Sequence, residues 1–161
     1  MQLRKISFNL VAFLSCFLFL AAVSSPTMAQ GPAAISATTI PESELIQPAD
    51  LAKTLTSGSP KPLVLQVGPK VFFQEARITG SKYGGAGSSA QGLQLLEKTV
   101  LGMPKDQYIV LYCGCCPWNR CPNVGPAFAR LRELGYTNVK VLYLANNFGD
   151  DWVRKGYPQE H

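Results

Sequence analysis

The stretch QYIVLYCGCCPWNRCPNVGPAFARLRELGYTNVKVLYL, residues 107–144, decides the fold. It begins with an uninterrupted β-favouring run at 109–111, which is typical of a strand buried on both faces. Apolar residues at helical spacing follow over 124–135, and a second apolar run at 138–144 predicts another buried strand. The stretch therefore predicts a strand, a cysteine-rich loop, a helix and a strand in succession.

The segments outside this unit continue the alternation of helices and strands. Pro48 suits the first turn of a helix that Gly58 ends, and an apolar run at 62–68 predicts a further buried strand. The other expected helices are short, at 70–76, at 92–100 and around an inward-packing Trp152. Such alternation predicts a single α/β domain with a parallel sheet of about four to five strands and helices on both faces.

The ends of these elements carry recognisable signals. Asn123 is expected to cap the start of the helix that follows the cysteine-rich loop, and Gly135 to end it. The connection at 80–92 is rich in glycine but lacks the spacing of a phosphate-binding loop. We expect this connection to be a flexible surface segment.

The N-terminus has the three parts of a secretory signal peptide. Arg4 and Lys5 precede an apolar run, and Ala29 supplies a small residue for cleavage. The run is roughly 16 residues long, shorter than the about 20 of a membrane-spanning helix, and an uncleaved anchor is the alternative. The expected organisation is a signal peptide at 1–29, a flexible lead-in at 30–45 and a folded domain at 46–161. Such a signal would export the chain to the periplasm or the cell exterior, with cleavage near Ala29.

The net charge excludes one class of function. The chain carries +5, and the part after residue 29 carries +3 from thirteen basic and ten acidic residues. These basic residues are scattered, whereas nucleic-acid binding needs a basic stripe or patch. We expect no nucleic-acid partner, and contact with a membrane only through an uncleaved signal segment.

Four of the five cysteines fall within the loop, at Cys113, Cys115, Cys116 and Cys121. A disulfide framework would distribute its cysteines along the chain, so these four indicate local chemistry. Cys113 ends the strongest strand, and the loop leads to a helix N-terminus, where a thiolate gains nucleophilicity from a lowered pKa. The chain's single histidine, His161, is far away in the sequence, so a Cys–His pair is not expected.

The order of these landmarks resembles the rhodanese family over roughly residues 45–158. Tyr112-Cys113 matches the strand end that opens the family's active-site loop. Three further stretches match at 63–67, at 131–136 and at 152–158, where the chain reads LVLQV, LRELGY and WVRKGYP. Where the family usually has Asp-Val-Arg, this chain has Gln66-Val67-Gly68, so the usual polar link from that strand is missing. The loop is also longer than the family's and carries three extra cysteines.

The resemblance implies an exported single-domain sulfurtransferase. In such enzymes the loop cysteine takes a sulfane sulfur, becomes a persulfide and passes the sulfur to a thiol acceptor. Cys113 would be the nucleophile, and Gly114, Trp118 and Arg120 would bind the substrate, with Trp118 as a pocket wall and Arg120 attracting a small sulfur-containing anion. No cofactor is expected.

The three extra cysteines leave other functions open. Cys115, Cys116 and Cys121 could act as resolving or redox thiols, because small disulfide rings are strained and labile. Together with Cys113 they could instead bind copper or zinc, although the spacing is more compact than that of usual zinc sites. A catalytically inactive rhodanese-like module that binds a periplasmic protein is the remaining alternative.

Overall fold

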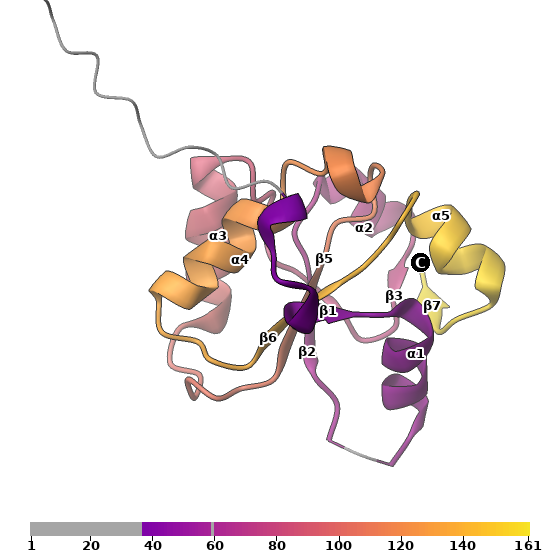
Figure 1. Cartoon of the computed structure of the whole chain (residues 1–161), viewed down its shortest axis with the longest axis horizontal. Helices are drawn as coiled ribbons and strands as arrows, with labels where there is room; N and C mark the ends of the chain where they lie inside the picture. Colours follow the sequence, from indigo (N-terminus) through magenta and orange to yellow (C-terminus); the bar gives the residue numbers. More distant parts are fainter. Residues whose placement is uncertain (1–36, 59) are drawn as a thin grey trace, which may run out of the picture. The chain divides into compact units, whose positions relative to one another are not determined.

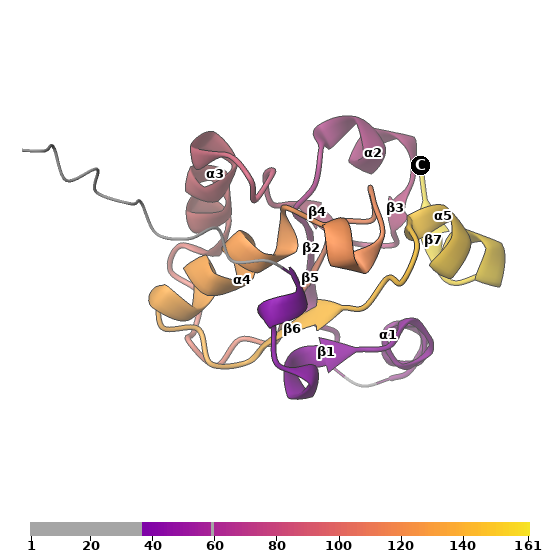
Figure 2. The same cartoon turned by 45° about the horizontal axis from the view of Figure 1, so that its top comes forward.

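The computed structural model describes residues 37–58 and 60–161, which are built around a five-stranded parallel sheet. The strands lie in the order β1-β6-β5-β2-β4 (Figure 1 shows the sheet, and Figure 2 labels each of its strands). Their bounds are Leu45–Ile46 for β1, Leu63–Gln66 for β2, Lys82–Tyr83 for β4, Ile109–Tyr112 for β5 and Val139–Leu142 for β6. Two short strands, β3 (Arg77–Ile78) and β7 (Gln159–Glu160), pair with each other in antiparallel orientation.

Strand β5 lies at the centre of the sheet, and all four of its residues are buried. Leu111 pairs with Leu65 of β2 on one side and with Val141 of β6 on the other. A strand covered on both faces needs apolar side chains in both directions, which explains its uninterrupted apolar run.

Helices cover both faces of the sheet (Figure 2). Their bounds are Pro48–Thr56 for α1, Lys70–Glu75 for α2, Ala90–Val100 for α3, Val124–Glu133 for α4 and Phe148–Asp151 for α5. On one face Leu96 of α3 and Leu131 of α4 share a buried cluster with Leu111. On the other face Leu51 of α1 and Trp152, just after α5, pack in a cluster with the intervening strand residues. The predicted α/β fold is thus confirmed, as is the inward packing of Trp152.

The segment before residue 46 differs from the prediction. Ala37 and Ile40 are buried in the core, and β1 pairs with β6 along an edge of the sheet. The expectation of a flexible lead-in is therefore wrong for residues 37–45, because two apolar side chains and a strand anchor this segment. The signal peptide predicted at 1–29, and residues 30–36, lie outside the described residues. Within residues 37–58 and 60–161, no helix is both long and apolar enough to cross a membrane.

The glycine-rich connection is also not the flexible surface segment that its composition predicts. Gly85 and Gly87 are buried, and a Cβ on Gly87 would lie 2.1 Å from the carbonyl oxygen of Asn123. A Cβ on Gly85, whose φ is +93°, would lie 2.3 Å from the carbonyl oxygen of Gly92. Gly85 therefore allows close backbone packing against α3, and Gly87 allows it against the start of α4, which positions Asn123.

Tyr112 connects the central strand to β3, and its loss is the first testable prediction. The buried phenol accepts a hydrogen bond from Ile78 N at 3.2 Å and lies 3.2 Å from Ser81 Oγ. Tyr112→Phe leaves the buried Ile78 N–H without a partner, which is expected to lower the free energy of unfolding by about 1–3 kcal/mol. Urea denaturation, with an unchanged m-value, measures this loss.

The matched control for this change is Tyr108→Phe. The Tyr108 hydroxyl makes no hydrogen bond to the part of the chain that the structure describes, so the expected change is within about 0.5 kcal/mol. Equal losses in the two variants would show that the Tyr112 hydroxyl bonds contribute nothing to stability.

Candidate thiol site

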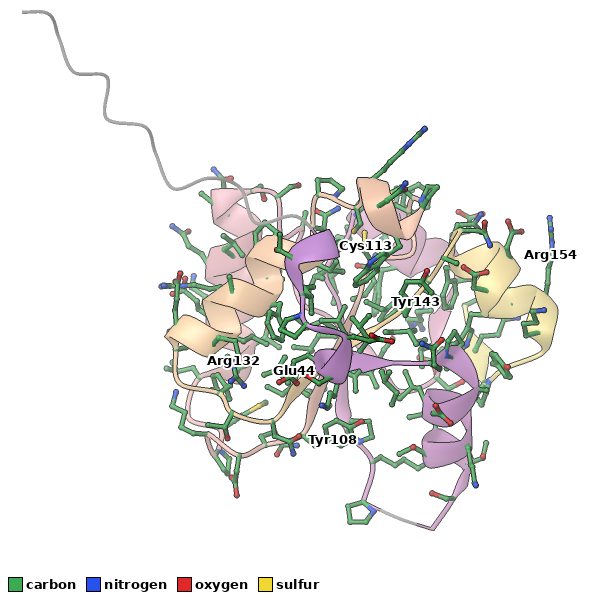
Figure 3. The ribbon with its side chains drawn as sticks, in the orientation of Figure 1. Glu44, Tyr108, Cys113, Arg132, Tyr143 and Arg154 are labelled. Atoms are coloured by element: carbon green, nitrogen blue, oxygen red, sulfur yellow. The ribbon has the colours of Figure 1, made fainter. Side chains whose placement is uncertain are left out.

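The loop between β5 and α4, residues 113–123, carries four free thiols. It leaves the carboxyl end of the central strand, where parallel sheets bind their ligands. The neighbouring connection after β6 supports the loop, since Trp118 N donates to the Ala145 carbonyl at 3.2 Å and the Trp118 ring lies 5.2 Å from that of Tyr143. Figure 3 labels Cys113 and Tyr143, which mark these two connections.

Three of the four sulfurs form a row. Cys113 Sγ lies 3.1 Å from Cys115 Sγ, which in turn lies 3.3 Å from Cys116 Sγ. Cys113 is only 4% exposed, whereas Cys115 and Cys116 are half-buried. A reagent in solution therefore reaches Cys115 more readily than Cys113.

The departure from the family pattern at 66–68 has a structural role. Gln66 is buried, and its Nε2 donates to the carbonyl oxygen of Cys113 at 3.2 Å. A Cβ on Gly68 would lie 2.8 Å from Cys113 Sγ, so only glycine leaves room for that sulfur. The expected loss of a polar link from this strand is therefore wrong, because Gln66 supplies one, and it holds the start of the cysteine loop.

Asn123 is the site residue that the sequence analysis assigned wrongly. It makes no side-chain capping bond to α4. Instead its Oδ1 accepts from Ser88 N at 3.1 Å, and its Nδ2 donates to Cys113 Sγ at 3.3 Å and lies 4.0 Å from Cys115 Sγ. The glycine-rich segment at 80–92 was the available signal, because glycines allow its backbone to come close to Asn123.

The protonation of the first two thiols follows from their hydrogen bonds. Donation from the Cys113 thiol lowers the pKa of Cys115 to about 6, with smaller support from Cys116 and Asn123 and against the effect of burial. The same bonds to Cys115 and to Cys121, together with burial, strongly raise the pKa of Cys113. The arrangement therefore favours a thiolate at Cys115 and a thiol at Cys113.

The pKa values of the other two cysteines, Cys121 and Cys116, are also shifted in opposite directions. The bond from Cys113 and the backbone N–H groups of Val124 and Asn123 lower the pKa of Cys121 to about 7, although burial opposes them. Burial and the bond to Cys115 raise the pKa of Cys116 to about 12. Cys121 is thus the thiol that meets the N-terminus of α4, but it is buried and less accessible than Cys115.

A cavity of about 560 Å³ opens beside Cys113 and Cys115. Its other lining residues come from β2, α2, β5, the α5 region and the C-terminal segment: Gln66, Phe72, Glu75, Ala76, Tyr112, Gly114, Asn147, Phe148, Gly149, Val153, Gln159 and His161. His161, remote in the sequence, therefore lies in the same cavity as two cysteines. Antiparallel pairing of β7 with β3 brings the C-terminal segment there, which the sequence pattern did not predict.

The predicted substrate-binding residues take different positions. Gly114 lines the large cavity, and its φ of +79° and close approach to Phe148 require glycine. Trp118 lines a much smaller space of about 10 Å³, together with Cys113, Cys116 and Cys121. Arg120 is exposed and lines neither cavity. Its role in attracting an anion stays a prediction, without geometric support from the described residues.

A metal site receives no support from the geometry either. Among residues 37–58 and 60–161, no group of three or more His, Cys, Asp or Glu side chains is arranged to hold a metal ion. The thiols instead contact one another in a row that ends where Cys116 Sγ lies 3.7 Å from the Arg120 carbonyl.

The lowered pKa of Cys115 leads to a pH prediction. Because the thiolate is the reactive form, alkylation of Cys115 by iodoacetamide should rise with pH around a midpoint near 6, where an ordinary thiol has its midpoint at about 8.5. Mass mapping of the alkylated peptides over a pH series measures each cysteine separately. A Cys115 midpoint above about 8 would contradict the hydrogen-bond network described above.

Comparison with known proteins agrees on the fold. No family model and no curated protein matches the chain. The solved structure of the BH2092 protein from Bacillus halodurans matches with a TM-score of 0.57 and 22% identity, over 73% of this chain and 77% of that one. The rhodanese-like domain of the Alr3790 protein from Anabaena sp. matches with a TM-score of 0.54 and 19% identity, over 73% and 78%.

Proposed function

We propose that this chain, which has the fold of rhodanese-like domains, transfers sulfane sulfur through a cysteine persulfide in its four-cysteine loop. The observation that supports the proposal is the position of Cys115. This thiol is half-buried, lines the cavity and lies next to the sulfurs of Cys113 and Cys116. A low-pKa, accessible thiolate is the nucleophile that sulfur transfer needs.

The geometry gives the two central thiols separate roles. The Cys115 thiolate attacks the outer sulfur of a donor R–S–SH, so that a bond to Cys115 forms and the donor's S–S bond breaks. The leaving group departs as RSH with the proton that the outer sulfur carried, which leaves a persulfide anion on Cys115. Cys113, whose Sγ lies 3.1 Å from that of Cys115, stabilises the attacking thiolate by a hydrogen bond. This is covalent catalysis, and it consumes no external oxidant.

This assignment moves the nucleophile from Cys113, as predicted from the sequence, to Cys115. Cys113 is buried, and its contacts with the Cys115 and Cys121 side chains raise its pKa, so it is the poorer candidate for the attacking thiolate. Asn123 Nδ2 contacts Cys113 Sγ at 3.3 Å and orients it beside Cys115. Cys113 remains close enough to receive the sulfur in a second step.

Mass mapping after treatment with a sulfane donor tests the proposal. The reduced protein is incubated with a donor, its thiols are blocked, and peptides spanning the loop are analysed for the mass of one added sulfur. The proposal expects the added sulfur on Cys115 and its loss when a thiol acceptor is supplied. If no loop cysteine gains sulfur from any donor, the chain is a rhodanese-like fold without this activity, such as a binding module.

Thiol–disulfide exchange is the second candidate, and the 3.1 Å separation of the Cys113 and Cys115 sulfurs favours it. A bridge between them would close a small ring, and strained bridges are easily reduced. A disulfide substrate would be the oxidant, and its two sulfurs would leave as thiols. Loss of two protons from the loop peptide, without added sulfur, is the outcome that distinguishes this candidate.

We also propose that the chain acts after export. The basic residues Arg4 and Lys5, the apolar run at 8–23 and the small residue Ala29 support this proposal. Fractionation of cells that express the full chain, with N-terminal sequencing of the product, tests it. A chain that keeps residues 1–29 and stays with the cytosol would contradict export.

A further inference from the structure

Two residues that line the cavity beside Cys115 each carry a buried side-chain oxygen without a partner. Gln66 Oε1 and Gln159 Oε1 make no hydrogen bond within residues 37–58 and 60–161, and both side chains line the cavity. The orientation of Gln66 is set by the Cys113 carbonyl, which can only accept a hydrogen bond and therefore faces Nε2. A buried acceptor without a donor is costly, so these two oxygens favour a ligand that carries donors.

Glu75 and His161 line the same cavity. His161 Nδ1 lies 2.7 Å from the backbone carbonyl of Glu75, which can only accept, so Nδ1 bears a proton. Glu75 is exposed, and it is the one acidic residue among the described residues that line the cavity. Its negative charge, like the two glutamine oxygens, favours donors such as N–H groups or an ammonium.

The cavity offers an anion no matching cation. The described lining residues include no lysine or arginine. Arg77, on the strand paired with β7, is already engaged by the Glu160 carboxylate at 2.9 Å and the His161 carbonyl at 2.8 Å. A small dianion would meet the negative charge of Glu75 here without a lysine or arginine among the described lining residues to offset it, which is unfavourable.

The remaining lining is apolar and roomy. The apolar lining residues include Phe72, Ala76, Phe148 and Val153. A volume of about 560 Å³ is that of a site for an organic molecule, and it is much larger than a small inorganic ion needs.

We infer that the cavity takes an organic persulfide that carries an ammonium or N–H donors on an apolar body, and that it discriminates against small sulfur anions. This inference rests on the proposed sulfur transfer. The Cys115 thiolate bonds to the outer sulfur, the donor's S–S bond breaks, and the aminothiol leaves with the proton that the outer sulfur carried. The ammonium would face the acceptor atoms of Gln66, Gln159 and Glu75.

Mixed-disulfide formation tests the ligand class without depending on sulfur transfer. Cystamine and dithiodipropionate are disulfides of similar length that carry two ammonium groups and two carboxylates, respectively. The rate at which each modifies Cys115 is measured by mass and divided by its rate with the urea-unfolded protein. We expect cystamine to be favoured about tenfold at low salt, with the preference shrinking as salt is added. Equal rates, or faster modification by dithiodipropionate, would overturn the inference.

Charge reversal at the cavity rim gives the matched variant. Glu75→Lys should remove the cystamine preference or reverse it, and Gln159→Leu should reduce it several-fold. Glu42→Lys makes the same charge change at an exposed site outside the cavity and should leave the preference as it is. If Glu42→Lys alters the preference as much as Glu75→Lys does, the effect is one of net charge and the inference fails.

A second assay separates this inference from the proposed function. Persulfide formation on the loop is compared with cysteamine persulfide and with thiosulfate as donors. A cystamine preference without any sulfur uptake would refute the sulfur-transfer function and leave the ligand class standing. Sulfur uptake that is as fast from thiosulfate as from cysteamine persulfide would overturn the ligand class and leave the function standing.

Discussion

Cys115→Ser is expected to slow sulfur uptake from a persulfide donor by about two orders of magnitude or more, because it removes the attacking thiolate. The remaining cysteines are poor substitutes. Cys113 and Cys121 are buried, and burial is the largest cause of the raised pKa of Cys116. The uptake rate of each single variant, measured at pH 7 by mass mapping of the loop, gives the size of this effect.

The same variant should lose the fast alkylation at low pH. At pH 6 about half of a thiol with a pKa near 6 is ionised, against about 0.3% of one with an ordinary pKa of 8.5. The lower intrinsic nucleophilicity of the more acidic thiolate cancels about a factor of ten to twenty, which leaves an advantage of about tenfold. Iodoacetamide should therefore modify the wild-type loop at pH 6 about ten times faster than it modifies the Cys115→Ser loop.

Two matched cysteine variants make this prediction specific. Cys121→Ser changes a thiol of the same loop that does not line the large cavity, and it should retain most of the sulfur uptake. Cys113→Ala should keep the attack but raise the pKa of Cys115, because it removes the bond from the Cys113 thiol, which is the largest cause of the lowering. Full uptake in Cys115→Ser together with none in Cys113→Ala would return the nucleophile to Cys113.

The largest expected loss of stability is that of Trp152→Ala, at about 3–5 kcal/mol. Trp152 is fully buried, its ring centroid lies 6.3 Å from that of Phe148 and 5.2 Å from that of Tyr157, and its Nε1 donates to the Pro158 carbonyl at 3.0 Å. The substitution leaves a large cavity and an unpaired carbonyl. Since small domains are stable by about 5–15 kcal/mol, this single change consumes a large part of the total.

Urea denaturation followed by circular dichroism measures this loss. Trp152→Phe keeps a ring and should cost clearly less, which keeps the comparison useful if the alanine variant is unfolded. Leu101→Ala removes an apolar side chain that is 83% exposed and should change stability by no more than about 0.5 kcal/mol. A loss below about 1 kcal/mol in Trp152→Ala would contradict the packing described for this face of the sheet.

Much of the fold could be predicted because it follows from apolar patterns among residues that are close together in the sequence. The apolar run of β5 identified a strand covered on both faces, and the helical spacing after residue 123 identified α4. Gly135, with φ of +87°, ends that helix as predicted, because a left-handed residue is needed there. The error at 37–45 arose because a composition of small and polar residues did not reveal that Ala37 and Ile40 fill core positions.

The candidate site was only partly predictable. Its location at the end of the central strand followed from topology, which places ligands beyond the carboxyl ends of parallel strands. The partners of the thiols could not be inferred, since Gln66 lies 47 positions from Cys113 and Asn123 lies ten positions away. No periodic pattern connects residues that meet only after the chain has folded.

The sequence by itself determined the α/β alternation, the buried central strand and the placing of four cysteines between that strand and a helix, since each depends on residues close together in the chain. Only the tertiary structure decided which cysteine combines a lowered pKa with access to the cavity. That choice depends on burial, on a row of sulfurs about 3 Å apart, and on the long-range approach of Gln66, Gly68 and Asn123 to Cys113. It likewise decided that His161 shares the cavity of Cys115, because strand pairing, and not sequence proximity, brings the two segments together.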